Sequence, residues 1–224
     1  MAHQILSRLE GKGWLSRLRR GLYSIVSLSS MDRDPMVENP WMVAMEVFEP
    51  AFISGWSAAE HWDLTEQVFN TVAVVTTRKQ RQTLHEFGGV RFRTRTIPGE
   101  RFFGDKAVWF GSAAVRIADP SRLMIDIADM PKFGGGGRHM VDVMRSYWRS
   151  EHADPARLLE YARRYARGSV FKRIGFLAEK SGVSKEWLDE CRALITPGLA
   201  DLDPDAPHEG PIVSNWNLRV NVPA

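Results

Sequence analysis

Three dipeptides, each a helix N-cap residue followed by proline, constrain the fold of this chain most strongly. Asn39-Pro40, Asp119-Pro120 and Asp154-Pro155 each predict a helix that begins at the proline. Asn and Asp side chains accept backbone N–H groups of the first turn, and proline is tolerated at the first helical position. Ser57-Ala58-Ala59-Glu60 has the pattern of a capping box and predicts a further helix start. Strand-like runs lie between these starts, at residues 69–77, 90–97, 106–110 and 113–117.

The C-terminal part of the chain has the apolar spacing of helices. Helical periodicity predicts four of them, at roughly residues 137–150, 155–167, 169–181 and 184–195. A polar, proline-rich tract from Pro197 to Pro211 and a final apolar segment, Ile212–Val222, follow. We therefore expect an α+β chain whose mixed α/β part ends in a helical region.

The first residues predict a separate small unit. Residues 3–12 have helical spacing, and residues 14–18 and 22–26 read as two short strands joined by Arg19-Arg20-Gly21. A helix followed by a hairpin with a basic tip is the order of parts in a winged helix. Only one helix fits ahead of the wing, where about three are usual, so we expect a partial winged helix. The expected domains are residues 1–34, which include the start of a linker, and residues 35–224.

The basic residues of the chain are concentrated in this unit. Residues 1–30 hold five basic residues and one acid, whereas the remainder holds 25 basic and 26 acidic residues, for a net charge of +3. Arg and Lys neutralise phosphates and release counterions, which favours binding to DNA; the alternative is a solvated charged turn. The expected DNA contacts are Arg8, Lys12, Arg17, Arg19 and Arg20, with Tyr23 supporting the wing.

Composition excludes some classes of protein. The longest apolar runs, such as Val72–Val75, are far shorter than the roughly 20 residues of a membrane span. Residues 1–10 show no secretory signal. A single cysteine, Cys191, excludes an internal disulfide and fits a reducing compartment, so we expect a cytoplasmic protein.

Two further features are weaker signals for a partner. Arg91, Arg93 and Arg95 alternate in a predicted strand and would project from one face, toward nucleic acid, an acidic protein or solvent. The glycines of 134–137 precede a helix but lack the Gly-Lys-Ser/Thr of a phosphate-binding loop, so a flexible loop, or one closely packed against a partner, is expected. Arg138 follows this loop and joins the arginine stripe as a candidate partner contact.

No pattern of catalytic or metal-binding residues stands out. Cys191 lies on an apolar helix face and is expected to be buried and inert. Asp126 and Asp129 share a helix face and could hold a metal, but solvated or capping carboxylates are the expected reading. His61 and His139 lack ligand-spaced neighbours. We expect no enzyme, no catalytic residues, no cofactor and no metal.

Four segments resemble one family, the AbiEi antitoxins of AbiE-type toxin–antitoxin systems. Gly13–Tyr23 is similar to the wing of these proteins, and Ile53–Gln67 to their most recognisable segment. Asp119-Pro120 with Leu123–Asp126, and then Pro131–Gly136, match the later pattern. The resemblance covers about residues 5–150.

The resemblance implies a bacterial protein with a winged-helix N-terminal domain and a C-terminal antitoxin domain. It would bind an operator in its own promoter, repress its operon and counteract a co-encoded nucleotidyltransferase-like toxin, directly or indirectly. Family members usually carry two further helices before this point, so either the start lies upstream or the DNA-binding unit is reduced. The alternatives are a nucleic-acid-processing enzyme that uses Asp126 and Asp129, or a transcriptional regulator without a toxin.

Overall fold

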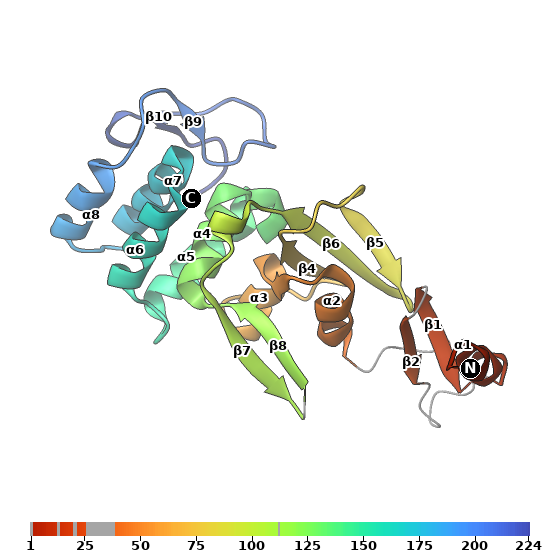
Figure 1. The fold of residues 1–224 in the computed structure, drawn as a ribbon. Coiled ribbons are helices and arrows are strands. Elements are labelled where there is room, and N and C mark those ends of the chain that lie inside the picture. Colours follow the sequence, from red (N-terminus) through yellow and green to blue (C-terminus); the bar gives the residue numbers. More distant parts are fainter. Residues whose placement is uncertain (1, 13, 20–21, 26–38, 112) are drawn as a thin grey trace.

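The computed structural model describes residues 2–12, 14–19, 22–25, 39–111 and 113–224, and it has the α+β architecture expected from the sequence (Figure 1). The N-terminal part consists of helix α1 (Ala2–Gly11) and the antiparallel strands β1 (Leu15–Arg19) and β2 (Leu22–Ile25). The predicted helix and hairpin are therefore confirmed. The hairpin tip at residues 20–21, the last residue of the second predicted strand (Val26) and residues 27–38 of the predicted linker lie outside the described residues.

A six-stranded mixed sheet forms the centre of the molecule, in the order β5-β6-β4-β3-β8-β7. Its strands are β3 (Ala51–Ile53), β4 (Thr71–Thr76), β5 (Leu84–Phe87), β6 (Val90–Thr96), β7 (Asp105–Phe110) and β8 (Ala113–Ala118). Parallel pairing joins β4 to β6 and β3 to β8, and the other neighbours are antiparallel. All four predicted strands are present, whereas β3 and β5 were not predicted.

Helices cover both faces of this sheet, as the alternating side chains of β6 show. Phe92 points to one face, where its ring centroid lies 5.8 Å from that of Phe48 in helix α2 (Pro40–Phe48). Arg93 and Arg95 point to the other face, toward Trp56 of α3 (Gly55–His61) and Asp126 of α4 (Pro120–Asp129). Alternation along this strand thus places Phe92 and the arginines on opposite faces of the sheet.

The helix starts follow the predicted caps with one exception. Asn39, Asp119 and Asp154 each cap a helix that begins at the following proline. The predicted capping box at residues 57–60 is wrong, because α3 begins at Gly55 after Ser54. Ser57 lies inside that helix, where its hydroxyl accepts the backbone N–H of Ala73 at 3.0 Å. The hydroxyl therefore joins α3 to β4.

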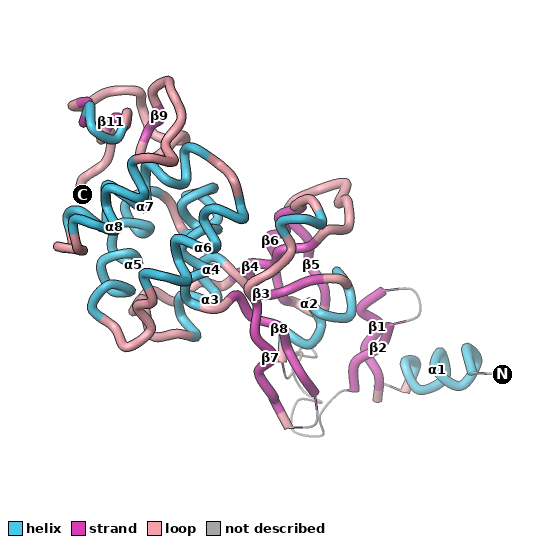
Figure 2. The backbone as a smooth tube through the Cα atoms, turned by 60° about the vertical axis from the view of Figure 1, so that its left-hand side comes forward, coloured by secondary structure: helices cyan, strands magenta, loops and turns pink. Residues whose placement is uncertain are grey.

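The four predicted C-terminal helices are confirmed and gather on one side of the molecule (Figure 2). They are α5 (Gly137–Arg149), α6 (Pro155–Tyr165), α7 (Gly168–Lys180) and α8 (Lys185–Arg192). A three-stranded sheet follows, made of β9 (Ala200–Asp201), β10 (Ile212–Val213) and β11 (Leu218–Arg219). Trp216 is fully buried and lies against Gly175 of α7, which fixes this C-terminal segment on the helices.

Three short 3-10 helices complete the described elements: η2 (Gly99–Arg101), η3 (Pro131–Gly134) and η4 (Ser214–Trp216). Within the described part of the chain, no helix has the length and apolarity that crossing a bilayer requires.

Candidate functional site

The N-terminal unit carries a basic, partly aromatic surface. Arg8, Lys12 and Arg17 are exposed, and the backbone N–H of Lys12 donates to the carbonyl of Arg8 at 3.2 Å. The Lys12 ammonium lies 5.8 Å from the ring centre of Trp14, which is 56% exposed. In the hairpin, Arg17 pairs with the half-buried Tyr23 across the strands. Directly opposite residues in a hairpin have neighbouring side chains, so Arg17 and Tyr23 share one face.

For two of the predicted DNA contacts, the structure describes no side chain. Arg19 ends β1 opposite Leu22, and its side chain is outside the described part of the structure. Arg20 lies outside the described residues altogether. The assignment of this surface to DNA therefore stays a prediction.

The arginines of β6 differ sharply in exposure. Arg91 is exposed, Arg93 is half-buried 5.8 Å from the Trp56 ring centre, and Arg95 is only 7% exposed. The expected shared face is correct, but the reading of the stripe as a solvent-facing surface is wrong for Arg95. Helix α4 covers this part of the sheet and supplies carboxylates there.

Arg95 belongs to a buried ionic network. Its guanidinium contacts the carboxylate of Asp129 and donates to the backbone carbonyl of Asp126 at 3.0 Å and to the Tyr165 hydroxyl at 2.9 Å. Desolvation alone lowers the pKa of Arg95, but the negative charges of Asp126 and Asp129 raise it, and the net shift is upward. Arg95 is thus held as a cation that joins β6 to α4 and α6.

Asp126 has its own set of donors. Ser54 donates to its carboxylate at 2.8 Å, and Arg122 donates to both carboxylate oxygens at 2.9 and 3.1 Å. Asp126 and Arg122 are both completely buried. The expectation that Asp126 and Asp129 are solvated or capping carboxylates is therefore wrong: the helical spacing placed them on one face, and that face points into the protein.

These contacts argue against a metal site at Asp126 and Asp129. A metal ion at Asp126 or Asp129 would have to displace arginine and hydroxyl donors that already occupy the carboxylate oxygens. Within the described ranges, no group of three or more His, Cys, Asp and Glu residues has a metal-binding arrangement. Cys191 is fully buried as expected, and burial raises the pKa of its thiol to about 12, so the unreactive thiol form dominates near neutral pH.

The glycine loop before α5 is packed against the rest of the chain at Gly134, Gly135 and Gly137, whereas a Cβ at Gly136 would meet no atom within 4 Å. The N–H of Gly137 donates to the carboxylate of Asp203 at 2.7 Å, so a side chain of the protein already occupies this helix N-terminus. His139 lies beneath the loop, where it contacts the carbonyl of Gly134 and lies 2.7 Å from the Thr65 hydroxyl. The loop therefore packs against its own chain, and the expected packing against a partner stays a prediction. Arg138 is exposed at the start of the helix.

Replacing Gly137 with alanine tests this packing. The new Cβ would lie 2.5 Å from the Cβ of Asp203 and 2.7 Å from its Oδ2, which is closer than van der Waals contact. Overpacking of this kind costs about 1–3 kcal/mol, so we expect a lower free energy of unfolding by urea denaturation. Gly99→Ala is the control, because a Cβ there meets no atom within 4 Å. Equal stability of the two variants would contradict the packed loop.

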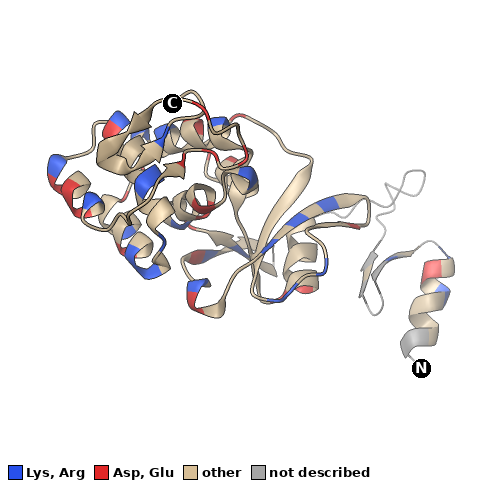
Figure 3. Cartoon of the chain, turned by 90° about the horizontal axis from the view of Figure 1, so that it is seen from above, with Lys and Arg blue, Asp and Glu red and all other residues tan. Residues whose placement is uncertain are grey.

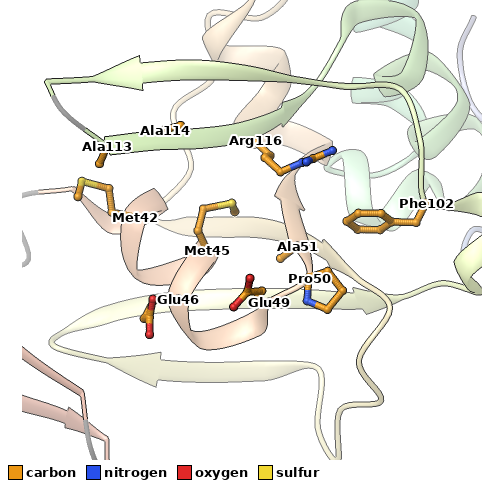
Figure 4. A pocket seen from close by; sticks show the side chains of 10 residues that line it. All are labelled: Met42, Met45, Glu46, Glu49, Pro50, Ala51, Phe102, Ala113, Ala114 and Arg116. Carbon is orange, nitrogen blue, oxygen red and sulfur yellow. The ribbon is translucent and has the colours of Figure 1, made fainter.

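Cavities lined by described residues open on the sheet. One, of about 400 Å³, lies between α2 and the β7–β8 hairpin, with Met42 and Met45 on one side and Arg116 on the other (Figure 4). Glu46 and Glu49 give it an acidic rim. The second, of about 390 Å³, lies near the end of β6 and is lined by Arg93, Arg95 and Lys132. Elsewhere, over the helical region, basic and acidic residues are interspersed (Figure 3).

No protein-family profile matches the chain, and no curated protein sequence does. Among solved structures, the chain is similar to the crystal structure of the Rv2827c protein from Mycobacterium tuberculosis. The two are 14% identical, with a TM-score of 0.66, over 96% of this chain and 78% of the other. The shared feature is the fold. Sequence identity this low carries no statement about activity.

Proposed function

We propose that the chain is an AbiEi-like antitoxin of the cytoplasm that represses its own operon and counteracts a co-encoded nucleotidyltransferase-like toxin. The observation that carries the proposal is the convergence of three of the four segments that resemble this family. Ser54, in the segment Ile53–Gln67, donates to Asp126, in the segment that begins at Asp119, at 2.8 Å. Gly55, which has a φ of +53°, packs on the segment Pro131–Gly136. The contact is so close that a Cβ at Gly55 would collide with the carbonyl of Phe133. These residues therefore form one structural unit.

Packing around this unit indicates that the residues of these segments determine the fold. The Trp62 indole donates to the carbonyl of Ala118 at 2.8 Å, and the rings of Trp56 and Phe133 lie 6.1 Å apart. Motif residues thus specify how α3, α4 and η3 meet. The partner contacts of an antitoxin would lie on the surrounding surface, where Arg91 and Arg138 are exposed.

The N-terminal unit supports the DNA-binding half of the proposal. It combines exposed cations with an exposed aromatic side chain, Trp14, beside a β-hairpin. In a winged helix, a helix enters the major groove while the wing contacts the backbone or minor groove. Arg8 and Lys12 on the helical side and Arg17 on the hairpin would supply these phosphate contacts.

A growth-rescue assay tests the proposal. The neighbouring toxin gene is induced in cells that carry the full-length protein, its variant with Arg17, Arg19 and Arg20 replaced by alanine, or an empty vector. We expect rescue by both proteins, because the antitoxin activity is assigned to residues 35–224. A promoter–reporter fusion in the same cells should be repressed by the wild-type protein alone.

The outcomes separate the candidate functions. Growth arrest with both proteins would contradict the antitoxin assignment, and reporter repression without rescue would indicate a transcriptional regulator that has no toxin partner. Rescue that is lost in the arginine variant would move the antitoxin activity to the N-terminal unit. Immunoblots of both proteins are the control for equal accumulation.

A further inference from the structure

The cavity at the end of β6 has a cationic lining. It is bordered by β6, by the loop that follows β4 and by η3, and its volume is about 390 Å³. Arg93, Arg95 and Lys132 line it, together with residues that include Gln80 and Met130, which is 43% exposed. No Asp or Glu is among the described residues that line it. The cavity therefore presents donors to a ligand and no like-charged group that would repel an anion.

The three cations of the lining are neutralised to different degrees. Arg95 is paired with Asp129, and Lys132 lies 3.8 Å from Asp205 on the surface. Arg93 has no carboxylate partner within the described part of the chain, and its buried Nε has no hydrogen-bond acceptor. Its guanidinium rests 5.8 Å from the Trp56 ring centre, which orients the group without satisfying its donors. The Nε itself is out of reach of a ligand, so an anion in the cavity would be held by the charge of the guanidinium, which no carboxylate of the described residues neutralises.

We propose that this cavity binds the phosphate group of a small phosphorylated molecule. Donors reach it from three separate segments, and a tetrahedral anion can accept hydrogen bonds in several directions, whereas a planar carboxylate is restricted to one plane. The exposed Met130 thioether gives the organic part of such a ligand an apolar contact. Nucleic-acid backbones contact protruding side chains, whereas Arg93 is half-buried in the cavity, so a free terminal phosphate fits better than an internal phosphodiester. The inference is independent of the antitoxin assignment.

Calorimetric titration of the full-length protein tests this site. The probes are adenosine 5′-monophosphate, inorganic phosphate, adenosine and acetate at constant ionic strength. We expect binding of the two phosphate compounds and none of adenosine or acetate. Arg93→Gln should weaken the binding of adenosine 5′-monophosphate about 10- to 100-fold, as expected for the loss of charge-assisted hydrogen bonds.

Arg91→Gln is the matched control, because Arg91 lies on the same face of the same strand but is exposed and outside the cavity. The affinity of the Arg91→Gln variant for adenosine 5′-monophosphate should stay within about twofold of wild type, as expected for a distant, screened charge. Lys132→Gln, at a side chain that is 60% exposed, should weaken binding a few-fold, and it serves as the second variant if Arg93→Gln does not fold.

Several results would overturn the proposal. These are failure of the wild-type protein to bind either phosphate compound at millimolar concentration, equal binding of acetate, and equal losses in the Arg91 and Arg93 variants. Duplex DNA is the fifth probe. Unchanged DNA affinity in Arg93→Gln is expected, whereas a loss for DNA without any for free phosphate would assign Arg93 to a nucleic-acid backbone instead.

Discussion

Replacing Asp126 with alanine is expected to lower the free energy of unfolding by about 3–5 kcal/mol, the typical cost of removing one partner of a buried ion pair. Arg122, which is completely buried, would lose both of its carboxylate contacts, and the Ser54 hydroxyl would lose its acceptor. Arg122 also donates to the Phe103 carbonyl at 3.0 Å, so it cannot move to water without breaking the contact between α4 and the segment before β7. Urea denaturation followed by circular dichroism measures the loss.

Asp142→Ala is the control for the effect of burial. Asp142 pairs with Arg145 at 3.1 Å, and the two side chains are 56% and 46% exposed. Exposed pairs contribute less than about 1 kcal/mol, because water and salt screen them and side-chain entropy opposes them. Similar losses in the Asp126 and Asp142 variants would contradict the buried network. A change in the denaturant slope would indicate that the unfolded state had changed as well.

The sequence predicted the helices well, because their start signals are local. Asn39, Asp119 and Asp154 each satisfy a backbone N–H within three residues, so no distant contact is needed to set these helix starts. The two missed strands lack such signals. The strand Ala51–Ile53 is short and fully buried, so it shows no alternation. Leu84–Phe87 is a four-residue strand at the sheet edge, too short to show a clear period.

The buried network could not be predicted for a different reason. Alternation correctly placed Arg93 and Arg95 on one face of a strand, but it says nothing about which helix covers that face. The carboxylate of Asp129, which binds Arg95, comes from 34 residues further along the chain. The cavity beside Arg93 likewise combines residues from three separate segments. A sequence pattern gives the direction of a side chain, whereas its exposure depends on tertiary packing.

DNA affinity is expected to fall about 10²- to 10³-fold between 50 and 200 mM salt. If Arg8, Lys12, Arg17, Arg19 and Arg20 each neutralise one phosphate, log K against log salt should have a slope near −4.5 per protomer. Titration of a labelled promoter fragment at four salt concentrations measures this slope. A flat response would contradict the assignment of the N-terminal cations to DNA.

Replacing Arg19 and Arg20 with alanine should make the slope less steep by about 1.8, because two phosphate contacts are lost. Affinity should fall alike for the promoter and for unrelated duplexes, since contacts to the backbone position a protein without specifying sequence. The matched control replaces Arg145 and Arg157, two exposed arginines in the helical region that pair with Asp142 and Asp154. It removes the same charge from another surface and should leave the slope unchanged. Equal effects of the two double variants would mean that net charge, and not the N-terminal surface, governs DNA binding.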